Sequence, residues 1–489
     1  MHHSEYTAPA ECRAKPSAPP RVHFIGIGGT AMVAGARLAI DAGWEVRGSD
    51  NPLYPPTSLL VARLGVPVHQ GYDAANLDWD PDIVVVGNAL SRGNPEVEAA
   101  LERRLRYVSL PEWIKEVVLR YRRPIVVAGC HGKTTTTALT AWLLERCGRD
   151  PGYLIGGEPL GFAQTARLGR DNGPFVIEGD EYDTAFFDKR AKFFHYLPEI
   201  AVVTSIEFDH GDIYPDLDAI IRAFRLMLRQ IPASGCLLAC ADQPHARALA
   251  EHAFSRVATY GFSPDATYRA EPIAPRDGRL AMRVRRDGAL WGEFDAPVVG
   301  RHNLLNALAA LAVGDLLGVD PAPLREALRA FPGVRRRMEI FLEARGALFI
   351  DDFAHHPTAI RETIAGARER WPGRRLRVLC EPRSNTMVTN RFQHETAQAL
   401  AAADDVVIGP IHRADTIPAA NRLDRAEVCR LIQAEGVPAA ACDDPADIVA
   451  RLHASVTPGD IILICSNGAF GGLYARLRET FADEADKAP

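Results

Sequence analysis

One short segment, residues 128–135, limits the possible folds of this chain more than any other. It reads Ala-Gly-Cys-His-Gly-Lys-Thr-Thr, follows an apolar run that predicts a strand, and precedes a stretch that predicts a helix. In such a unit successive backbone N–H groups wrap phosphates, while Lys133 adds a positive charge and Thr134 a hydroxyl for Mg²⁺. The usual first glycine of the pattern is absent, because position 127 is Val. The flanking strand and helix still favour a phosphate loop over a chance Gly-Lys-Thr.

A second glycine-rich turn, Gly-Ile-Gly-Gly-Thr-Ala-Met at residues 26–32, also joins a predicted strand to a predicted helix. Its glycines allow a tight turn, and the helix N-terminus offers free N–H groups to a phosphate. The next predicted strand ends at Ser49-Asp50, where an acidic residue is placed to reach a ribose hydroxyl. Ala31 replaces the third glycine of the dinucleotide pattern, so nucleotide binding and an ordinary turn both stay open.

Three regions of the chain alternate short apolar runs with helical stretches, as is typical of parallel sheets with crossover helices. At 489 residues the chain is also too long for one ordinary core. The sequence therefore predicts an α/β protein of three domains at residues 21–122, 123–334 and 335–489. The polar, proline-rich residues 1–20 predict a disordered tail.

The overall composition excludes several classes of protein. The net charge is −6 with both signs mixed, so no basic stripe predicts nucleic-acid binding. No apolar run approaches the ~20 residues that a helix needs to cross a bilayer. The N-terminus lacks the apolar core of a secretory signal, and nine scattered cysteines without Cys-x-x-Cys indicate reduced thiols. We therefore expect a cytoplasmic protein that binds neither membrane nor nucleic acid.

Acidic residues follow two predicted strands of the middle region. Glu178-Gly-Asp180-Glu181 comes after the strand at 175–177, where a metal-binding acid belongs downstream of a phosphate loop. A solvated acidic loop is the alternative. Glu207-Phe-Asp-His-Gly-Asp follows the next strand, and its His210 is predicted either to ligate a metal or to cap a helix.

Two further segments carry polar side chains at spacings that suggest binding. In Gly-Arg-His-Asn-Leu-Leu-Asn, Asn303 and Asn306 share one helical face that suits the edge of an adenine, unless Asn303 simply caps the helix. Asp-Asp-Phe-Ala-His-His-Pro at 351–357 has the residue types of a zinc or two-metal site. No third cluster with matching ligand spacing accompanies it.

Together these segments, in this order, resemble the Mur ligase family from Arg21 to about Leu477. The strings Gly-x-His-Gly-Lys-Thr-Thr, Gly-Arg-His-Asn-x-x-Asn and Asp-Asp-Phe-Ala-His-His-Pro-Thr carry the resemblance. It implies a Rossmann-like N-terminal domain that binds UDP-muramate, a central phosphate-loop ATPase domain, and a Rossmann-like C-terminal domain. The last would help to bind ATP and the incoming peptide.

Within the family, the chain is more similar to the branch that adds a tripeptide than to the branch that adds L-alanine. The similarity lies at residues 54–58, 87–95, 183–190, 381–387 and 466–472. It implies ATP-dependent joining of L-alanyl-γ-D-glutamyl-meso-diaminopimelate to UDP-N-acetylmuramate through an acyl phosphate, in bacterial peptidoglycan recycling. Addition of L-alanine in peptidoglycan biosynthesis is the alternative. Roles in cell-wall biogenesis, cell shape, the cell cycle and cell division would follow.

The resemblance also implies which residues do the work. The catalytic residues would be Lys133, Glu178, His210 and Arg337. The residues that contact ATP would be Gly129, His131, Gly132, Lys133, Thr134, Thr135, His302, Asn303, Asn306 and Asp352. The residues that contact UDP-muramate would be Gly26, Gly28, Gly29, Ser49, Asp50 and Asn88. The Mg²⁺ ligands would be Thr134, Glu178 and His210, and the peptide-binding residues would be Arg383, Ser384 and Asn385.

Arg383 is singled out because its planar cation suits a peptide carboxylate and it follows the C-terminal end of a predicted strand. The alternative is an arginine that pairs with Glu381 in a structural loop. Two positions depart from the family pattern. Cys130 stands where a threonine is usual, so a hydroxyl is lost although the loop remains. Arg225 occupies the spacing of a carbamylated lysine, so no carbamate bridge is expected.

Two other readings of the chain stay open at this point. An NAD-dependent oxidoreductase would use the turn at 26–32 but leave Lys133 unexplained. A nucleotide switch would bind ATP at Lys133 without ligation. The chain is expected to be a monomer or a weak homodimer.

Overall fold

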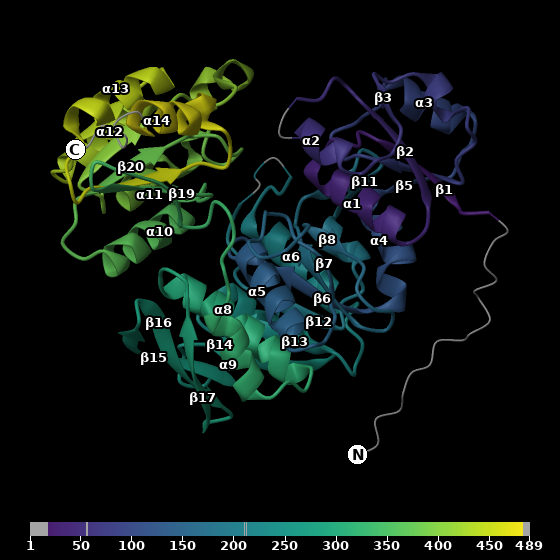
Figure 1. The fold of residues 1–489 in the computed structure, drawn as a ribbon, viewed down its shortest axis with the longest axis horizontal. Coiled ribbons are helices and arrows are strands. Elements are labelled where there is room, and N and C mark those ends of the chain that lie inside the picture. Colours follow the sequence, from purple (N-terminus) through teal and green to yellow (C-terminus); the bar gives the residue numbers. More distant parts are fainter. Residues whose placement is uncertain (1–17, 55–56, 210, 212, 483–489) are drawn as a thin grey trace.

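The computed structural model describes residues 18–54, 57–209, 211 and 213–482. Three large sheets lie one after another in the chain, with strands inside residues 21–109, 123–296 and 339–465. Figure 1 shows the N-terminal body in purple and the C-terminal body in yellow, both above the central body. The prediction of three α/β domains is confirmed. Of the predicted tail, residues 1–17 lie outside the described residues.

The N-terminal sheet has five parallel strands in the order β3-β2-β1-β4-β5. Its strands are β1 Arg21–Ile25, β2 Glu45–Asp50, β3 Val68–Gln70, β4 Ile83–Val86 and β5 Tyr107–Ser109. The helices are α1 Thr30–Asp41, α2 Thr57–Ala62, α3 Pro95–Glu102 and α4 Leu110–Val117. The strand order reverses beside β1, which is where doubly wound folds place a ligand.

The central sheet has ten strands in the order β17-β16-β15-β14-β13-β12-β6-β9-β7-β8. The middle strands, which are parallel, are β6 Arg123–Ala128, β7 Gly152–Leu154, β9 Pro174–Gly179, β12 Ile200–Val203, β13 Cys236–Cys240 and β14 Arg256–Gly261. Short β8 Ala166–Arg167 pairs antiparallel with β7, and β10 Asp183–Ala185 with β11 Asp188–Ala191 forms a separate hairpin. The helices are α5 Lys133–Arg146, α6 Leu217–Leu228, α7 Pro244–Ala248, α8 Arg301–Leu316 and α9 Pro321–Arg329.

Strand β6 shows why the middle of this sheet is apolar throughout. Ile125 and Val127 pack into the core on one face, while Val126 and Ala128 pack into the core on the other. A strand covered on both faces must be apolar at successive positions. Buried helices α5 and α8 cover one face, and the core on the other face continues into the N-terminal domain.

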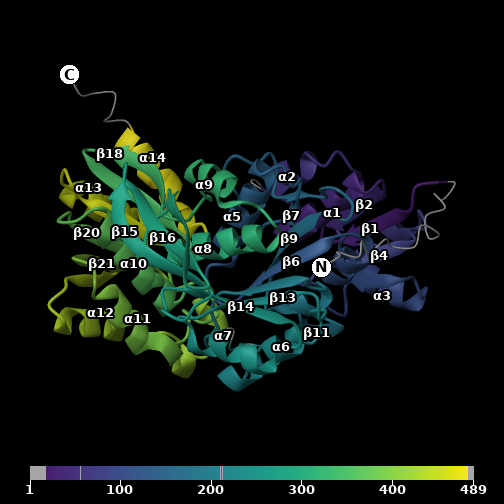
Figure 2. The same cartoon turned by 90° about the horizontal axis from the view of Figure 1, so that it is seen from below.

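Three antiparallel strands that the sequence analysis missed extend the central sheet at one edge (Figure 2). They are β15 Tyr268–Arg276, β16 Arg279–Arg286 and β17 Ala289–Ala296. Asp277-Gly278 and Asp287-Gly288 form the two turns, and all four residues have positive φ. Asp-Gly between strands is a strong signal for a two-residue hairpin, so the sequence did contain the information.

The C-terminal sheet has six strands in the order β18-β19-β23-β20-β21-β22, and only β18 is antiparallel to its neighbour. Its strands are β18 Glu339–Ala344, β19 Ala347–Asp352, β20 Leu376–Cys380, β21 Asp405–Ile408, β22 Ala439–Ala441 and β23 Ile461–Cys465. The helices are α10 Pro357–Arg370, α11 Gln393–Leu400, α12 Arg425–Ala434, α13 Pro445–Ser455 and α14 Leu473–Ala482.

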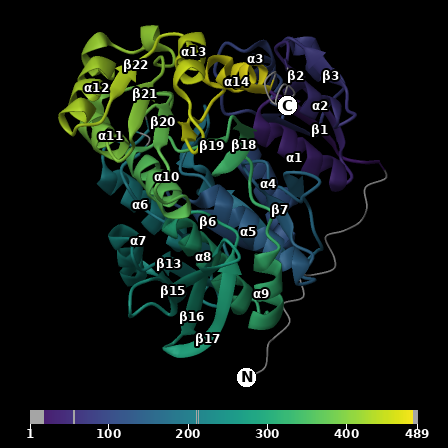
Figure 3. The ribbon, with the colours of Figure 1, turned by 60° about the vertical axis from the view of Figure 1, so that its left-hand side comes forward.

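The C-terminal domain meets the central domain along α10 and the loops after β12 (Figure 3). A Cβ atom at Gly366 of α10 would lie 3.0 Å from the Cα of Gly300, so the two backbones approach closely. The Arg391 guanidinium lies 3.6 Å from the centre of the Phe208 ring. These contacts bring the loops that follow β6, β12 and β19 to one place.

No helix within the described ranges is both long and apolar enough to cross a membrane. The eight cysteines in these ranges are free thiols, in line with the prediction from their scattered positions.

Candidate active site

The phosphate loop lies between β6 and α5, as predicted. Gly129 and Gly132 have φ values of 132° and 79°, which side chains with a Cβ rarely adopt. A Cβ at Gly132 would also lie 2.5 Å from Oδ1 of Asn306 on α8. No side chain caps α5, so the N–H groups of its first turn point into the site without a capping partner. This arrangement suits an anion such as a phosphate.

Lys133 at the start of α5 is held by an acidic residue that the sequence analysis did not select. Its Nζ lies 2.9 and 2.8 Å from the two carboxylate oxygens of Glu181, and 3.9 Å from Oδ1 of Asp180. Burial acts to lower the pKa of Lys133, but the charges of Glu181 and Asp180 outweigh it and the pKa is raised. Lys133 is therefore a cation. Glu181 was visible in the acidic segment after β9, but nothing distinguished it from its neighbours.

Thr134 and Glu178 lie side by side next to Lys133. The Thr134 hydroxyl donates a hydrogen bond of 3.0 Å to Glu178, whose other oxygen accepts one of 2.6 Å from the Gly156 amide. Burial raises the pKa of Glu178. A hydroxyl and a carboxylate are hard oxygen donors, so this pair fits Mg²⁺. His210, the third predicted ligand, lies outside the described residues.

Arg337 reaches this pair from the connection to the C-terminal domain. Its Nη2 lies 3.4 Å from the Thr134 hydroxyl. Burial lowers the pKa of Arg337, against the charges of Asp352 and Glu178. The structure thus places Lys133, Thr134, Glu178 and Arg337 together, although they come from three separate parts of the sequence.

The start of α8 lies against the phosphate loop. Asn306 accepts a hydrogen bond of 3.1 Å from Thr136 and donates one of 2.9 Å to Asn303, which in turn donates to the Val299 carbonyl. Capping by Asn303 is wrong, because α8 begins at Arg301 with Gly300 before it. Contact of the two asparagines with adenine stays a prediction. Burial lowers the pKa of nearby His302 to about 4, so its ring is neutral at pH 7.

The acidic residues at the end of β19 are engaged within the protein. Asp352 accepts 2.9 Å bonds from the amides of Met338 and Ala354, and a 3.2 Å bond from the Thr363 hydroxyl. A contact with ribose stays a prediction, and Oδ2, which among the described residues accepts only the Met338 bond, has an acceptor position left for it. Asp351 is bound by Arg336 and Tyr474. These partners explain why Asp351 and Asp352 do not form a metal site with the following histidines.

The thiol of Cys130 bridges the phosphate loop and the loop after β12. It donates a 3.3 Å hydrogen bond to the carbonyl of Glu207 and accepts a 3.2 Å bond from the amide of the same residue. The sulfur thus joins the loop after β6 to the loop after β12. The expectation that the loop survives without the usual hydroxyl agrees with this geometry.

A cavity of about 660 Å³ lies beside the turn at residues 26–32. The Asp50 carboxylate accepts a 2.7 Å bond from the Gly28 amide and a 3.0 Å bond from the Tyr72 hydroxyl. Among the predicted UDP-muramate residues, those that line the cavity are Gly26, Gly28, Gly29, Asp50 and Asn88. The central domain contributes Leu154, Thr184, Lys192 and Tyr196 to the lining.

Ser49 has a different position from the other predicted UDP-muramate residues. It is fully buried, and its hydroxyl donates a 2.6 Å hydrogen bond to buried Glu96, which also contacts His23. Successive side chains of a strand point to opposite faces, so Ser49 points away from the side on which Asp50 lies. Ser49 therefore belongs to a buried polar network within the N-terminal domain.

Lys192 is a residue of the cavity that the sequence analysis did not select. Its Nζ lies 2.7 Å from Oδ2 of Asp180, next to Lys133, and its side chain lines the cavity. Arg225, at the spacing of the family's modified lysine, is exposed on α6. Lys192 follows β11 in the sequence, and no local pattern links it to the phosphate loop.

The predicted peptide-binding residues follow β20. Arg383 Nη1 lies 3.4 Å from Glu381 and 3.2 Å from Nδ1 of His412. Ser384 accepts a hydrogen bond from the Met387 amide and donates one to the His355 carbonyl, so it supports the turn. Asn385 is exposed. The pair between Arg383 and Glu381 is present, but it leaves other guanidinium nitrogens for a ligand.

The sheets and the phosphate loop define an α/β enzyme of three domains whose phosphate-binding site lies where the central and C-terminal domains meet. Comparison with known proteins gives the same division. Residues 21–122 match the Mur ligase family catalytic domain, residues 127–314 the Mur ligase middle domain, and residues 336–468 the Mur ligase glutamate ligase domain.

Three relatives illustrate the similarity. The UDP-N-acetylmuramate–L-alanyl-γ-D-glutamyl-meso-2,6-diaminoheptandioate ligase of Escherichia coli (strain K12) is 41% identical over 96% of this chain and 100% of its own length. The UDP-N-acetylmuramate–L-alanine ligase of Methylobacillus flagellatus is 35% identical over 96% of this chain and 98% of its own. The crystal structure of a murein peptide ligase from Psychrobacter arcticus is 35% identical, with a TM-score of 0.70, and covers 94% of this chain and 98% of that one.

The chain belongs to the Mur ligase family. It is an ATP-dependent ligase that forms a C–N bond between an acid and an amino acid or peptide.

Proposed function

We propose that this ligase joins L-alanyl-γ-D-glutamyl-meso-diaminopimelate to UDP-N-acetylmuramate at the expense of ATP. Two relatives whose names carry this activity are 41% and 40% identical, against 35% to 37% for relatives named for L-alanine. The proposal includes the setting that such a reaction has, namely recycling of peptidoglycan in the bacterial cytoplasm. Contributions to cell-wall biogenesis, cell shape and division, and a monomer or weak homodimer as the active form, belong to the same proposal.

One observation carries the proposal: side chains connect the cavity to the phosphate loop. Lys192 lines the cavity and binds Asp180 at 2.7 Å, while Lys133 of the loop lies 3.9 Å from the same carboxylate. A substrate in the cavity and a nucleotide on the loop therefore have a common boundary. This boundary is where a carboxylate and a terminal phosphate must meet.

The carboxylate must be activated, because its oxygen is a poor leaving group when an amine attacks the carboxylate carbon. A lactyl carboxylate oxygen of UDP-N-acetylmuramate attacks the γ-phosphorus of ATP, and ADP leaves. The peptide amine then attacks the acyl carbon of the acyl phosphate, phosphate leaves, and the nitrogen loses a proton. Lys133 and Arg337 face the charge that spreads over the transferred group. A closed site would protect the acyl phosphate from water.

Mg²⁺ would neutralise charge on the phosphates. Thr134 and Glu178 are the described residues that would hold it, and His210 would hold a second ion. In this proposal the nucleotide lies along Gly129–Thr135, with His302, Asn303 and Asn306 beside the adenine. Arg383, Ser384 and Asn385 would face the peptide.

A product assay tests the proposal directly. The protein is supplied with ATP, Mg²⁺ and UDP-N-acetylmuramate, together with either the tripeptide or L-alanine, and the product is identified by mass. We expect the UDP-muramoyl tripeptide, formed with one ADP per product. A product with L-alanine alone would assign the chain to the other branch. ATP turnover without UDP-N-acetylmuramate would indicate a nucleotide switch, and hydride transfer an oxidoreductase.

A further inference from the structure

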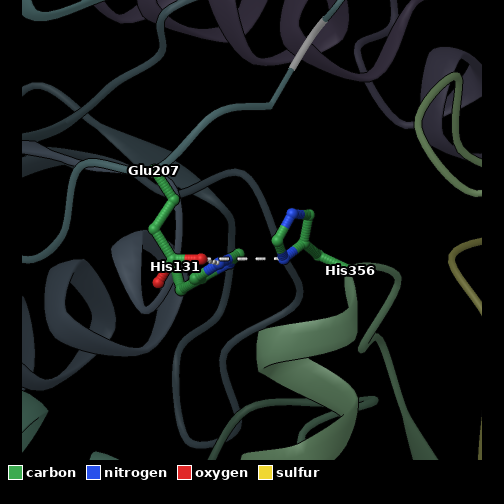
Figure 4. A group of neighbouring side chains, drawn as sticks. All are labelled: His131, Glu207 and His356. Atoms are coloured by element: carbon green, nitrogen blue, oxygen red, sulfur yellow. Dashed lines mark ion pairs between the residues drawn. The ribbon is translucent and has the colours of Figure 1, made fainter. Parts of the chain in front are cut away.

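Three side chains from distant parts of the sequence meet where the central and C-terminal domains touch (Figure 4). His131 comes from the phosphate loop, Glu207 from the loop after β12, and His356 from the start of α10. Glu207 Oε2 lies 3.5 Å from His131 Nε2 and 3.9 Å from His356 Nδ1. One ligand atom from each residue lies within 4.8 Å of the others. Two ligands at about 2 Å from one tetrahedral Zn²⁺ ion lie about 3.4 Å apart, so the side chains would draw somewhat closer when an ion binds.

Each imidazole has a nitrogen without a hydrogen-bond partner inside the described part of the protein. Nε2 of His131 and Nε2 of His356 are buried and make no hydrogen bond there. His356 is only 4% exposed. A buried nitrogen without a partner is costly, and a bound ion would remove this cost at His131, whose Nε2 faces Glu207. The two rings also lie near each other, with centroids 4.9 Å apart.

The side chains are of the types that bind an ion of this class. Two imidazoles and a carboxylate are a common ligand set for Zn²⁺.

The surroundings orient the cluster. The Thr358 hydroxyl donates a 2.7 Å hydrogen bond to Glu207 Oε2 and so fixes the carboxylate. Such supporting partners hold ligands in place. His356 Nδ1 accepts a 3.3 Å bond from the Thr358 amide, which caps α10. This bond is long, and an ion at Nδ1 would replace it.

We propose that His131, Glu207 and His356 form a binding site for a borderline transition-metal ion of the Zn²⁺ class, which links the central and C-terminal domains. The site is separate from the Mg²⁺ position at Thr134 and Glu178. Imidazoles favour Zn²⁺, Co²⁺ and Ni²⁺, whereas Mg²⁺ favours oxygen ligands. Three protein ligands leave a fourth position of a tetrahedral ion for water.

The site is tested by titrating metal-free, full-length protein with Zn²⁺ in excess Mg²⁺ and measuring heat, with the Co²⁺ absorption spectrum as a second readout. We compare wild type with Glu207→Gln, His131→Gln and His356→Asn. Asparagine caps helices well, so the last variant keeps α10 while it removes the imidazole. His245→Gln, at an exposed histidine on α7, is the matched control. Wild type, the three variants and the control all retain His2 and His3, so these two histidines are the same in every comparison.

We expect one Zn²⁺ per chain in wild type and control, and an affinity at least about tenfold lower in each of the three variants. Loss of affinity in His356→Asn shows that the C-terminal domain supplies a ligand. Equal affinity in wild type and His356→Asn overturns the proposal, as does displacement of Co²⁺ by Mg²⁺. Circular dichroism separates loss of a ligand from loss of the fold. If one variant misfolds, the affinities of the other two variants test the proposal.

Discussion

Lys133 and Glu181 form an ion pair inside the site, with Nζ 2.8 Å from one carboxylate oxygen and 2.9 Å from the other. Glu181 is only 1% exposed, so the pair is shielded from water. A phosphate that approaches Lys133 must share this cation with Glu181 or displace the Glu181 carboxylate from it. The ion pair therefore holds the lysine in position before the nucleotide arrives.

Replacement of Lys133 by Ala should abolish ligation and leave UDP-N-acetylmuramate binding intact. The loss of a positioned cation should cost about 3 kcal/mol or more of transition-state stabilisation. Product formation and calorimetric binding of UDP-N-acetylmuramate measure the two effects. Lys115→Ala on α4 is the control and should keep wild-type turnover. Turnover of Lys133→Ala within a few-fold of wild type would contradict the phosphate-loop assignment.

Replacement of Glu178 by Gln preserves shape but removes a charge beside Thr134. We expect lower activity at low Mg²⁺ that recovers in part at high Mg²⁺, because a weaker site is filled by mass action. The Mg²⁺ dependence of the rate is the measurement, with Glu102→Gln on α3 as control. An unchanged Mg²⁺ curve would mean that Glu178 serves only to bind Thr134 and the Gly156 amide.

Replacement of Arg383 by Ala should raise the KM for the tripeptide more than about tenfold, with little change for ATP and UDP-N-acetylmuramate. Arg383→Lys keeps the charge but not the planar fork and should recover only part of the affinity. Steady-state kinetics, with each of the three substrates varied in turn, measure these KM values. Arg383 packs over Gly468, where a Cβ would lie 2.1 Å from its Nε, so a structural role would instead raise all three KM values.

Cys130 offers a test of a single sulfur atom. Cys130→Ser should retain both hydrogen bonds to the Glu207 backbone, whereas Cys130→Ala leaves a buried amide and carbonyl without that partner. The alanine variant should lose about 1–3 kcal/mol of unfolding free energy relative to the serine variant. Urea unfolding of both variants measures the difference. Equal stability would show that the bridge between the two loops contributes nothing.

The buried Glu96 network predicts a pH effect in the N-terminal domain. Burial acts to raise the pKa of Glu96, but hydrogen bonds from His23, Ser49 and Asn76 outweigh it and lower the pKa below its ordinary 4.5. The folded state then binds this proton less tightly than the unfolded state. The stabilisation is therefore complete above about pH 4.5 and is lost as the pH falls through the folded-state pKa.

Glu96→Gln should consequently weaken the sheet by about 2 kcal/mol at pH 7, and the difference from wild type should shrink below about pH 4.5. Hydrogen exchange of the β1 and β4 amides, corrected for intrinsic rates, reports this local stability. A difference that is the same at pH 7 and pH 4 would show that the charge of Glu96 has no part in it.

Local patterns predicted the phosphate loop and the three sheets because strand, glycine turn and helix lie together in the chain. They could not predict that Lys133 pairs with Glu181. Glu178 and Asp180 lie in the same acidic segment and carry the same charge, so the sequence does not single out one of the three. The family resemblance placed Ser49 and Asp50 in one site, although neighbouring strand residues point to opposite faces. The hairpins at 268–296 were missed although Asp-Gly marks both turns. Lys192 and His356 reach the site only through tertiary packing.

The cavity beside Asp50 has walls from two domains, since Lys192 and Tyr196 belong to the central domain. A ligand that touches both walls favours the arrangement in which they face each other. Its binding free energy therefore adds to the adhesion between the two domains. A chain of several domains need not melt in one step. An occupied cavity should make the N-terminal and central domains melt together, so the width of the calorimetric transition becomes a measure of occupancy.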